Sequence, residues 1–240
     1  MFSAIEGFAG TQPFNDWFTP DTVQRHVLGT CVKAVDPFWG MGEFVYLKAP
    51  NDATVIKGSL VTWNELFVSV LLPSTAGQGF SFGVAMAPAI ANTFYWAQIS
   101  GYSIMKQTSD VAADVACAVA GTGLVGALAN GKQLCNARVR KAAAATKTVT
   151  ASVPNNSSYL VCPAGYDGLF LGMALSGTGI AASTVVAGLD PDGKKVYLGS
   201  AIGTIGDKLT TAAGSITLTG TFTGYLGVVI NRPFAQGQVV

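Results

Sequence analysis

The chain has 240 residues, of which 50% are hydrophobic and only 11% are charged, whereas about 25% of the residues are charged in an average soluble domain. Its formal net charge of +1 gives no electrostatic indication of nucleic-acid binding. So few charges protect a protein poorly against self-association. We therefore expect other subunits to cover part of its surface, or hydroxyl and amide groups to keep it in solution.

We expect neither a membrane span nor a targeting segment. No apolar run reaches the roughly 18 uninterrupted residues of a transmembrane helix, and the first ten residues lack the basic and long apolar regions of a secretory signal peptide. The 29 glycines, together with many Thr, Ser and Ala residues, are typical of short strands joined by tight turns. They do not favour a helical bundle.

The first 25 residues are predicted to form an extended arm. Their aromatic side chains are spread among Gly, Thr, Asn and Pro residues without a helical or strand period. A loose segment of this kind packs on its own domain or docks on a neighbour, and we favour docking. The aromatic residues of the arm are Phe2, Phe8, Phe14, Trp17 and Phe18.

Residues 26–150 are predicted to form a β core. The run Glu43–Lys48 alternates with a period of two, which is typical of a half-buried strand. The strongest strand signal covers 93–104, and Ser100-Gly101 within it indicates a bulge or a close backbone approach. The basic cluster in 138–147 is interpreted as a solvated linker, because no aromatic platform for nucleic acid accompanies it.

The composition changes near Thr148, where a second series of short strands begins. Strand-like segments 185–189 and 195–198 flank Asp190-Pro191-Asp192-Gly193, in which Pro and Gly occupy their usual turn positions. Farther on, 215–224 alternates cleanly, and an apolar closing strand follows.

The predicted fold class is therefore all-β, with three parts. An extended N-terminal arm spans 1–25. A β-barrel or β-sandwich core spans 26–150 and is completed by 215–240. A second small β-module, 151–214, is inserted before the C-terminal strand.

The sequence offers no catalytic, cofactor or metal site. The single histidine, His26, removes most acid–base and triad mechanisms and is interpreted as a hydrogen-bonding residue at a strand edge. Gly177-Thr178-Gly179 lacks the rest of a dinucleotide motif, and Asp190–Gly193 is too short for a calcium loop. Cysteines 31, 117, 135 and 162 have no C-x-x-C spacing and are expected to be buried thiols rather than zinc ligands or disulfides. We expect a non-enzymatic structural or binding protein.

Several motifs resemble a family of tailed-bacteriophage virion proteins, the head decoration or cement and minor capsid structural proteins. The matching segments are HVLGTCVKAVDPFWGMGEFVYLKA, GSLVTW, FGVAMAPAIANTFYWAQISGYSI and, near the C-terminus, VINRPFAQGQ. In addition, GLFLGMALSGTGIAASTVVAGLDPDGKKVYLGSAIGT is similar to a β-module of phage structural proteins. Ala182-Ser183 and Gly199 depart from the usual pattern of that module, which affects its loops rather than its β character.

This resemblance implies a protein made in the host cytoplasm that binds the outer surface of an icosahedral capsid. Its partners would be the major capsid protein and further copies of itself, as a homotrimer or another homo-oligomer. Aromatic anchors carry much of the energy of such interfaces, typically about 2 kcal/mol or more at each hot spot. Trp63, Tyr95 and Trp96 are expected in the core instead. Our candidates for capsid or subunit contact are Phe14, Trp17, Phe18, Phe38 and Trp39.

Two other functions stay open at this point. The protein could be a tail or baseplate component, since the inserted module occurs in many virion proteins. Alternatively, it could be a glycan-binding protein of the virion surface. A shallow groove with an exposed aromatic ring and a nearby carboxylate would favour that alternative.

Overall fold

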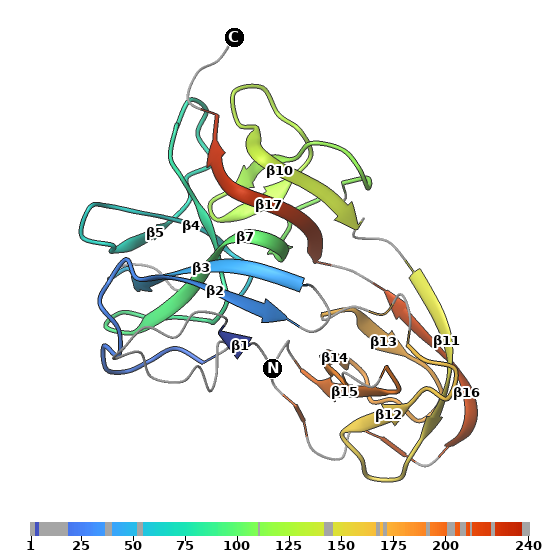
Figure 1. The fold of residues 1–240 in the computed structure, drawn as a ribbon. Helices are drawn as coiled ribbons and strands as arrows, with labels where there is room; N and C mark the ends of the chain where they lie inside the picture. The colour runs from blue at the N-terminus through green and yellow to red at the C-terminus, as the bar shows by residue number, and fades with distance from the viewer. Residues whose placement is uncertain are drawn as a thin grey trace. The chain divides into compact units, whose positions relative to one another are not determined.

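The computed structural model describes residues 3–4, 19–36, 40–51, 55–109, 111–141, 146–166, 169, 172–190, 193–200, 205–206, 210–211, 213–221 and 224–236. Within these residues the secondary structure consists of strands, bridges and turns, without a helix (Figure 1). The predicted all-β class is therefore confirmed.

The chain divides into two compact units. One comprises Met1–Ala142 together with Gly224–Val240, and the other comprises Ala143–Thr223. The predicted module limits of 151 and 214 differ from these boundaries, because they cut through β11 (Thr146–Val153) and β16 (Ala213–Thr221). These two strands pair along their whole length, so both belong to the inserted unit.

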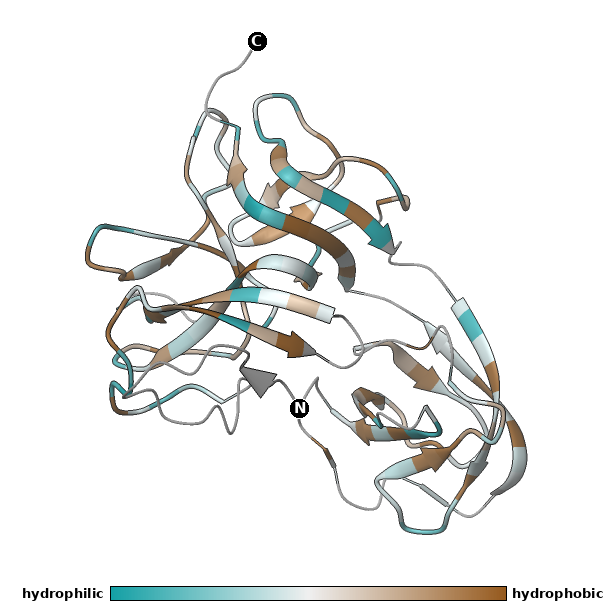
Figure 2. Ribbon diagram, viewed as in Figure 1, coloured by the Kyte–Doolittle hydropathy of each residue, from teal (hydrophilic) through white to brown (hydrophobic). Residues whose placement is uncertain are grey.

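The first unit is built on a nine-stranded sheet and a separate two-stranded sheet (Figure 1). The nine strands are β1 (Ser3–Ala4), β2 (Cys31–Asp36), β3 (Gly40–Lys48), β4 (Leu60–Trp63), β5 (Ser69–Leu71), β6 (Gly83–Ala85), β7 (Phe94–Lys106), β10 (Leu134–Lys141) and β17 (Tyr225–Ala235). Their order is β1-β2-β3-β7-β6-β4-β5, and β17 pairs with both β7 and β10. The small sheet joins β8 (Ala118–Gly121) to β9 (Leu124–Gly126). Figure 2 shows an apolar first half of β17 followed by a hydrophilic stretch.

The second unit is a closed barrel. Besides β11 and β16 it contains β12 (Tyr159–Val161), β13 (Ala174–Ser176), β14 (Val185–Leu189) and β15 (Lys195–Gly199). They close in the order β11-β12-β15-β14-β13-β16 around fully buried side chains such as Leu160 and Leu198. The predicted turn between β14 and β15 is confirmed, since the amide of Gly193 donates to the carbonyl of Asp190 at 3.0 Å. Gly193 has a φ of +76°, which glycine adopts without steric cost.

The strand β3 is buried on both faces, so the predicted half-buried strand is wrong in this respect. Val45 and Leu47 point into one hydrophobic cluster, whereas Phe44 and Tyr46 point into another. The second cluster also contains Trp96 of β7. The alternating pattern did not predict this burial, because residues 19–30 cover the face of β3 that the pattern leaves to solvent.

The predicted irregularity at Ser100-Gly101 is confirmed. The register between β3 and β7 shifts where Glu43 pairs with Ser100 and Phe44 with Gln98. Gly101 has a φ of +101°, and a Cβ on it would lie 2.5 Å from the carbonyl oxygen of Met41. The buried Gln98 amide stabilises the bulge by donating to the carbonyls of Ser100 and Tyr102, at 3.0 and 2.9 Å.

The basic segment is only partly a linker, which corrects its interpretation. Arg138 and Arg140 belong to β10, and Val228 and Val229 of β17 pair beside them. Arg140 Nη1 lies 2.7 Å from Asp114 Oδ1, and Arg138 Nη2 donates to the Asp114 carbonyl at 2.8 Å. These charges are thus held by a local acidic partner at the surface.

Two buried serines of the first unit should respond oppositely to substitution. Ser69 Oγ donates to the carbonyl of Lys48 and accepts from the Tyr95 hydroxyl, both at 2.8 Å. Ser103 Oγ is buried without a hydrogen-bond partner among the described residues. We expect Ser69→Ala to lower the free energy of unfolding by about 1–3 kcal/mol, because the Lys48 carbonyl and the Tyr95 hydroxyl each lose a hydrogen-bond partner. Ser103→Ala should leave stability unchanged or raise it by up to about 1 kcal/mol.

Urea denaturation followed by tryptophan fluorescence measures this difference. Trp17, Trp39, Trp63 and Trp96 all belong to the first unit, so the signal reports its unfolding alone. Equal losses from the two serine substitutions would contradict the hydrogen-bond assignment.

Candidate functional site

The five residues predicted to contact capsid or sister subunits lie outside the described residues. They are Phe14, Trp17, Phe18, Phe38 and Trp39. The predicted core positions of Tyr95 and Trp96 are confirmed, with 1% and 5% exposure. Trp63 is half-buried: it packs against the hydrophobic cluster of Val45 and Tyr95, as predicted, and it also lines a groove.

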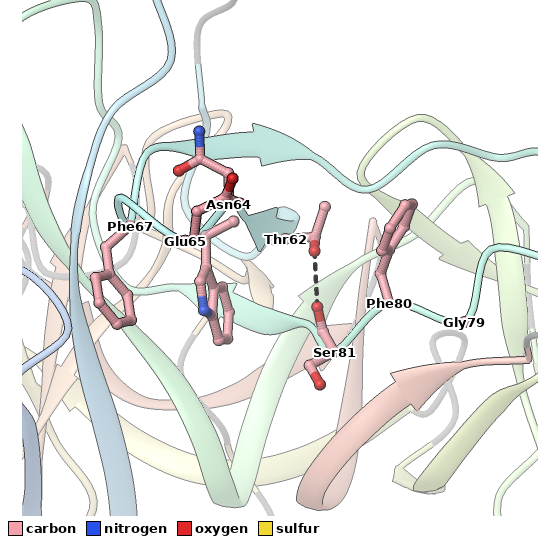
Figure 3. Close-up of a pocket in the computed structure, with 8 residues that line it drawn as sticks. Thr62, Asn64, Glu65, Phe67, Gly79, Phe80 and Ser81 are labelled. Carbon is pink, nitrogen blue, oxygen red and sulfur yellow. Dashed lines mark hydrogen bonds between the residues drawn. The ribbon is translucent and has the colours of Figure 1, made fainter.

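This groove, which we call the aromatic groove, has a volume of about 380 Å³. That lies near the lower end of the range of about 300–1,000 Å³ for small-ligand sites. Figure 3 shows Phe67 and Phe80 on opposite sides of the lining residues, with Asn64 and Glu65 close together. The groove is lined by Thr62, Trp63, Asn64, Glu65, Phe67, Gly79, Phe80 and Ser81.

One wall is the β4–β5 hairpin, whose loop depends on Asn64. The Asn64 side-chain oxygen accepts from the amides of Leu66 and Val68, both at 3.0 Å. This local bonding competes with strand formation, so the first residues of the run 65–72 form a loop and only Ser69–Leu71 form the short strand β5. Phe67 adopts a φ of +57° there, which is unusual for a bulky residue.

The Phe67 ring packs directly against Gly29. A Cβ on Gly29 would lie 2.3 Å from Phe67 Cζ, so the ring occupies the space that glycine leaves open. The amide of Lys48 donates to the Phe67 carbonyl at 3.0 Å, and the ring packs against the hydrophobic cluster of Val45 and Tyr95. These contacts hold the strained backbone in place.

The other wall is the segment 79–81, anchored at both ends. Thr62 Oγ1 donates to the Ser81 carbonyl at 2.8 Å, a bond drawn in Figure 3. The Ala235 amide donates to the Phe80 carbonyl at 2.9 Å, which ties the wall to β17. Phe80 keeps 48% of its surface exposed. The backbone is therefore fixed while the ring faces solvent.

The polar groups of the aromatic groove include a single ionisable side chain among the described residues. Among the described residues that line it, Glu65 is the only carboxylate, and there is no Lys, Arg or His. A lone exposed carboxylate has no second acid or base with which to share proton transfer. The groove combines aromatic surface, one acceptor and several neutral hydrogen-bonding groups.

The four cysteines are free thiols that differ in burial. All four are described, and none forms a disulfide; Cys117 and Cys162 are buried as predicted, but Cys31 is exposed and Cys135 is half-buried. Burial raises the pKa of the Cys117 thiol to about 12, so it stays protonated and unreactive at neutral pH. Among the described residues, no three His, Cys, Asp or Glu side chains are grouped to hold a metal ion.

His26 lies in a strap, residues 19–30, that crosses the Phe44–Tyr46 face of β3. Its ring packs edge-on against Tyr46, with a centroid distance of 5.0 Å, and lies 5.2 Å from the Trp96 ring. The Tyr46 hydroxyl donates to Asp21 Oδ2 at 2.7 Å, and Asp21 exchanges backbone hydrogen bonds with Phe94. His26 is thus an aromatic packing residue outside the strands, which corrects its predicted place at a strand edge.

We expect acidification to loosen this strap. Burial lowers the pKa of His26 below its ordinary 6.5, an effect that Arg25 reinforces and Asp21 opposes. The unfolded chain therefore binds the proton more readily, and the stabilisation present above pH 6.5 is lost as the pH falls below it. The tryptophan-monitored free energy of unfolding should decline between about pH 7.5 and about pH 5.5. His26→Phe keeps a ring but cannot titrate, so it should flatten this decline; an unchanged slope would refute the assignment.

The comparisons with known proteins add no family to these observations. No family model, curated protein or solved structure matches the chain. The resemblance to virion proteins therefore rests on the sequence motifs alone. No helix among the described residues has the length and apolarity needed to cross a membrane.

Sequence reasoning did not find the aromatic groove. Of the residues that line it, only Trp63 has a position predicted from the sequence, and that position is the core. Two local signals were available. Asn64 is a residue type that favours turns, and Asn64-Glu65 is a polar pair between two apolar segments. Neither signal indicates that 79–81 forms the opposite wall.

Proposed function

We propose that the protein is a non-enzymatic virion structural protein that binds the outer capsid surface and stabilises the phage head through multivalent subunit contacts. The observation that carries this proposal is the exposure of two large apolar side chains, Val23 at the end of the arm and Val27 just after it, in a chain with few charged residues. Val23 and Val27 in the strap are 71% and 76% exposed, and charged residues make up only 11% of the chain. Exposed apolar side chains at the end of a predicted docking segment favour an interface.

The strap supports this role because its backbone is fixed before any partner binds. Tyr46 and Phe94 hold Asp21, and the amide of Gly29 donates to the Tyr46 carbonyl at 2.8 Å. Exposed side chains on an ordered backbone lose less conformational entropy on docking than those on a mobile segment. Several such contacts per subunit would increase occupancy through avidity.

Truncation of the arm, residues 1–25, tests the proposal. Deletion of residues 1–18 keeps the Asp21 anchor, and we expect it to reduce occupancy on capsids that lack the protein by about tenfold or more, because linked sites bind cooperatively. Val23→Ser with Val27→Ser should reduce it further. Ile90→Ser, at a 60% exposed position outside the strap, is the control. Unchanged occupancy after both changes would contradict the proposal.

The same preparation can distinguish head from tail. Electron microscopy of virions labelled through this protein should place the label on the head. A label confined to the tail or baseplate would favour the alternative structural role.

A further inference from the structure

We propose that the aromatic groove binds an uncharged oligosaccharide, with a pyranose ring lying between Phe67 and Phe80. The lining residues and their polarity carry this inference. It does not depend on a place in a virion, because none of the candidate residues for capsid contact lines the groove. A failure to bind capsids would not contradict glycan binding, and a failure to bind glycans would not contradict capsid binding.

The apolar part of the groove matches the CH faces of a sugar ring. Trp63, Phe67 and Phe80 supply three aromatic side chains to the lining of the groove, and Figure 3 shows the rings of Phe67 and Phe80. Phe80 is 48% exposed, although its backbone is fixed by Ala235. Covering an exposed ring with a ligand's apolar face removes that ring from water, which favours binding.

The polar part of the groove matches hydroxyl groups, which both donate and accept hydrogen bonds. The Glu65 carboxylate can only accept. Asn64 uses its side-chain oxygen for the amides of Leu66 and Val68, so its NH₂ group is left to donate. The Ser81 hydroxyl can do both. A polyol satisfies all three groups at once.

The charge of the lining selects among ligand classes. The described lining contains no Lys, Arg or His, so a phosphorylated or sulfated sugar would find no cationic partner there and would be repelled by Glu65. An organic cation could use the rings and Glu65. However, a quaternary ammonium group has no acceptor for the Asn64 NH₂ group or the Ser81 hydroxyl. A neutral glycan is therefore the better match.

The groove is already shaped for its ligand. Gly29 seats the Phe67 ring, and the Thr62–Ser81 hydrogen bond fixes the spacing of the two walls. Carbohydrate binding is opposed by the entropy of ordering both partners, and a fixed site reduces that cost. The strained φ of Phe67 is consistent with a position maintained for the orientation of its ring.

The test uses the full-length protein on a panel of immobilised neutral oligosaccharides built from glucose, galactose or N-acetylglucosamine. Positive glycans are then titrated in solution, with the quenching of tryptophan fluorescence and calorimetry as readouts. Phe80→Ala and Glu65→Gln change exposed side chains and should leave the fold intact, which urea denaturation checks. We expect Phe80→Ala to weaken binding about tenfold to a hundredfold. Glu65→Gln should weaken it about threefold to tenfold, because the amide oxygen still accepts a hydrogen bond but without the charge. Phe234→Ala and Leu66→Ala are the controls, since both side chains are exposed and neither lines the groove.

Specific outcomes would overturn the proposal. It fails if no neutral glycan of the panel binds above background, or if binding is insensitive to both groove substitutions. Binding of choline chloride with no binding of neutral glycans would instead identify an organic-cation site. Equal weakening by the control variants would place the binding surface elsewhere.

Discussion

Gly101→Ala is expected to lower the free energy of unfolding of the first unit by more than about 3 kcal/mol. The new Cβ would lie 2.5 Å from the Met41 carbonyl oxygen and 3.1 Å from the Gly42 Cα. Both are backbone atoms of β3, so they cannot move aside as the end of a side chain could. The φ of +101° adds strain for any residue with a Cβ.

A second glycine in the same sheet separates these two effects. Gly40 has a φ of +79°, but a Cβ on it would meet no described atom within 4 Å. Gly40→Ala should therefore cost only the conformational strain, about 1 kcal/mol. Tryptophan-monitored urea denaturation at unchanged m-value gives both numbers. Equal losses from Gly101→Ala and Gly40→Ala would show that the close approach to β3 contributes nothing.

Gly29→Ala is expected to cost about 3 kcal/mol and also to weaken ligand binding at the aromatic groove. The new Cβ would overlap the Phe67 ring, with 2.3 and 2.4 Å to Cζ and Cε2. The ring cannot retreat easily, because it packs against the cluster around Val45 and Tyr95. It would be displaced toward the groove, and the spacing to Phe80 would change.

A double-mutant cycle assigns this loss to the ring. In a Phe67→Ala background a Cβ at position 29 has space, so Gly29→Ala should then cost only about 1 kcal/mol for its positive φ. The coupling between the two positions should therefore be about 2 kcal/mol. Additive losses would mean that the Gly29 backbone conformation alone matters and that the ring has no defined seat.

The two roles depend on different side chains of the first unit, so each can be tested without the other. The capsid role depends on the arm and on Val23 and Val27 of the strap. The glycan role depends on Phe80 and Glu65 of the groove. Variants at one surface therefore serve as folded controls for the other.

Local sequence patterns were sufficient to predict the all-β class and several individual features. Glycine at 101 and 193 marked a bulge and a turn because positive φ values favour residues without a Cβ. The density of aromatic and β-branched residues predicted the strand now seen as β7, Phe94–Lys106. These features depend on neighbouring residues, so a local pattern is enough to reveal them.

The remaining features emerged only from the folded chain, because long-range contacts carry no local signal. The burial of both faces of β3 depends on the strap that Asp21 fastens to Tyr46 and Phe94. Closure of the barrel depends on β11 meeting β16, which follows much later in the chain. The aromatic groove arises where the Asn64 loop meets Phe80, because Thr62 and β17 fix the second wall. The residue types determine which chemical groups line the groove, but only the folded chain brings these residues together around one space.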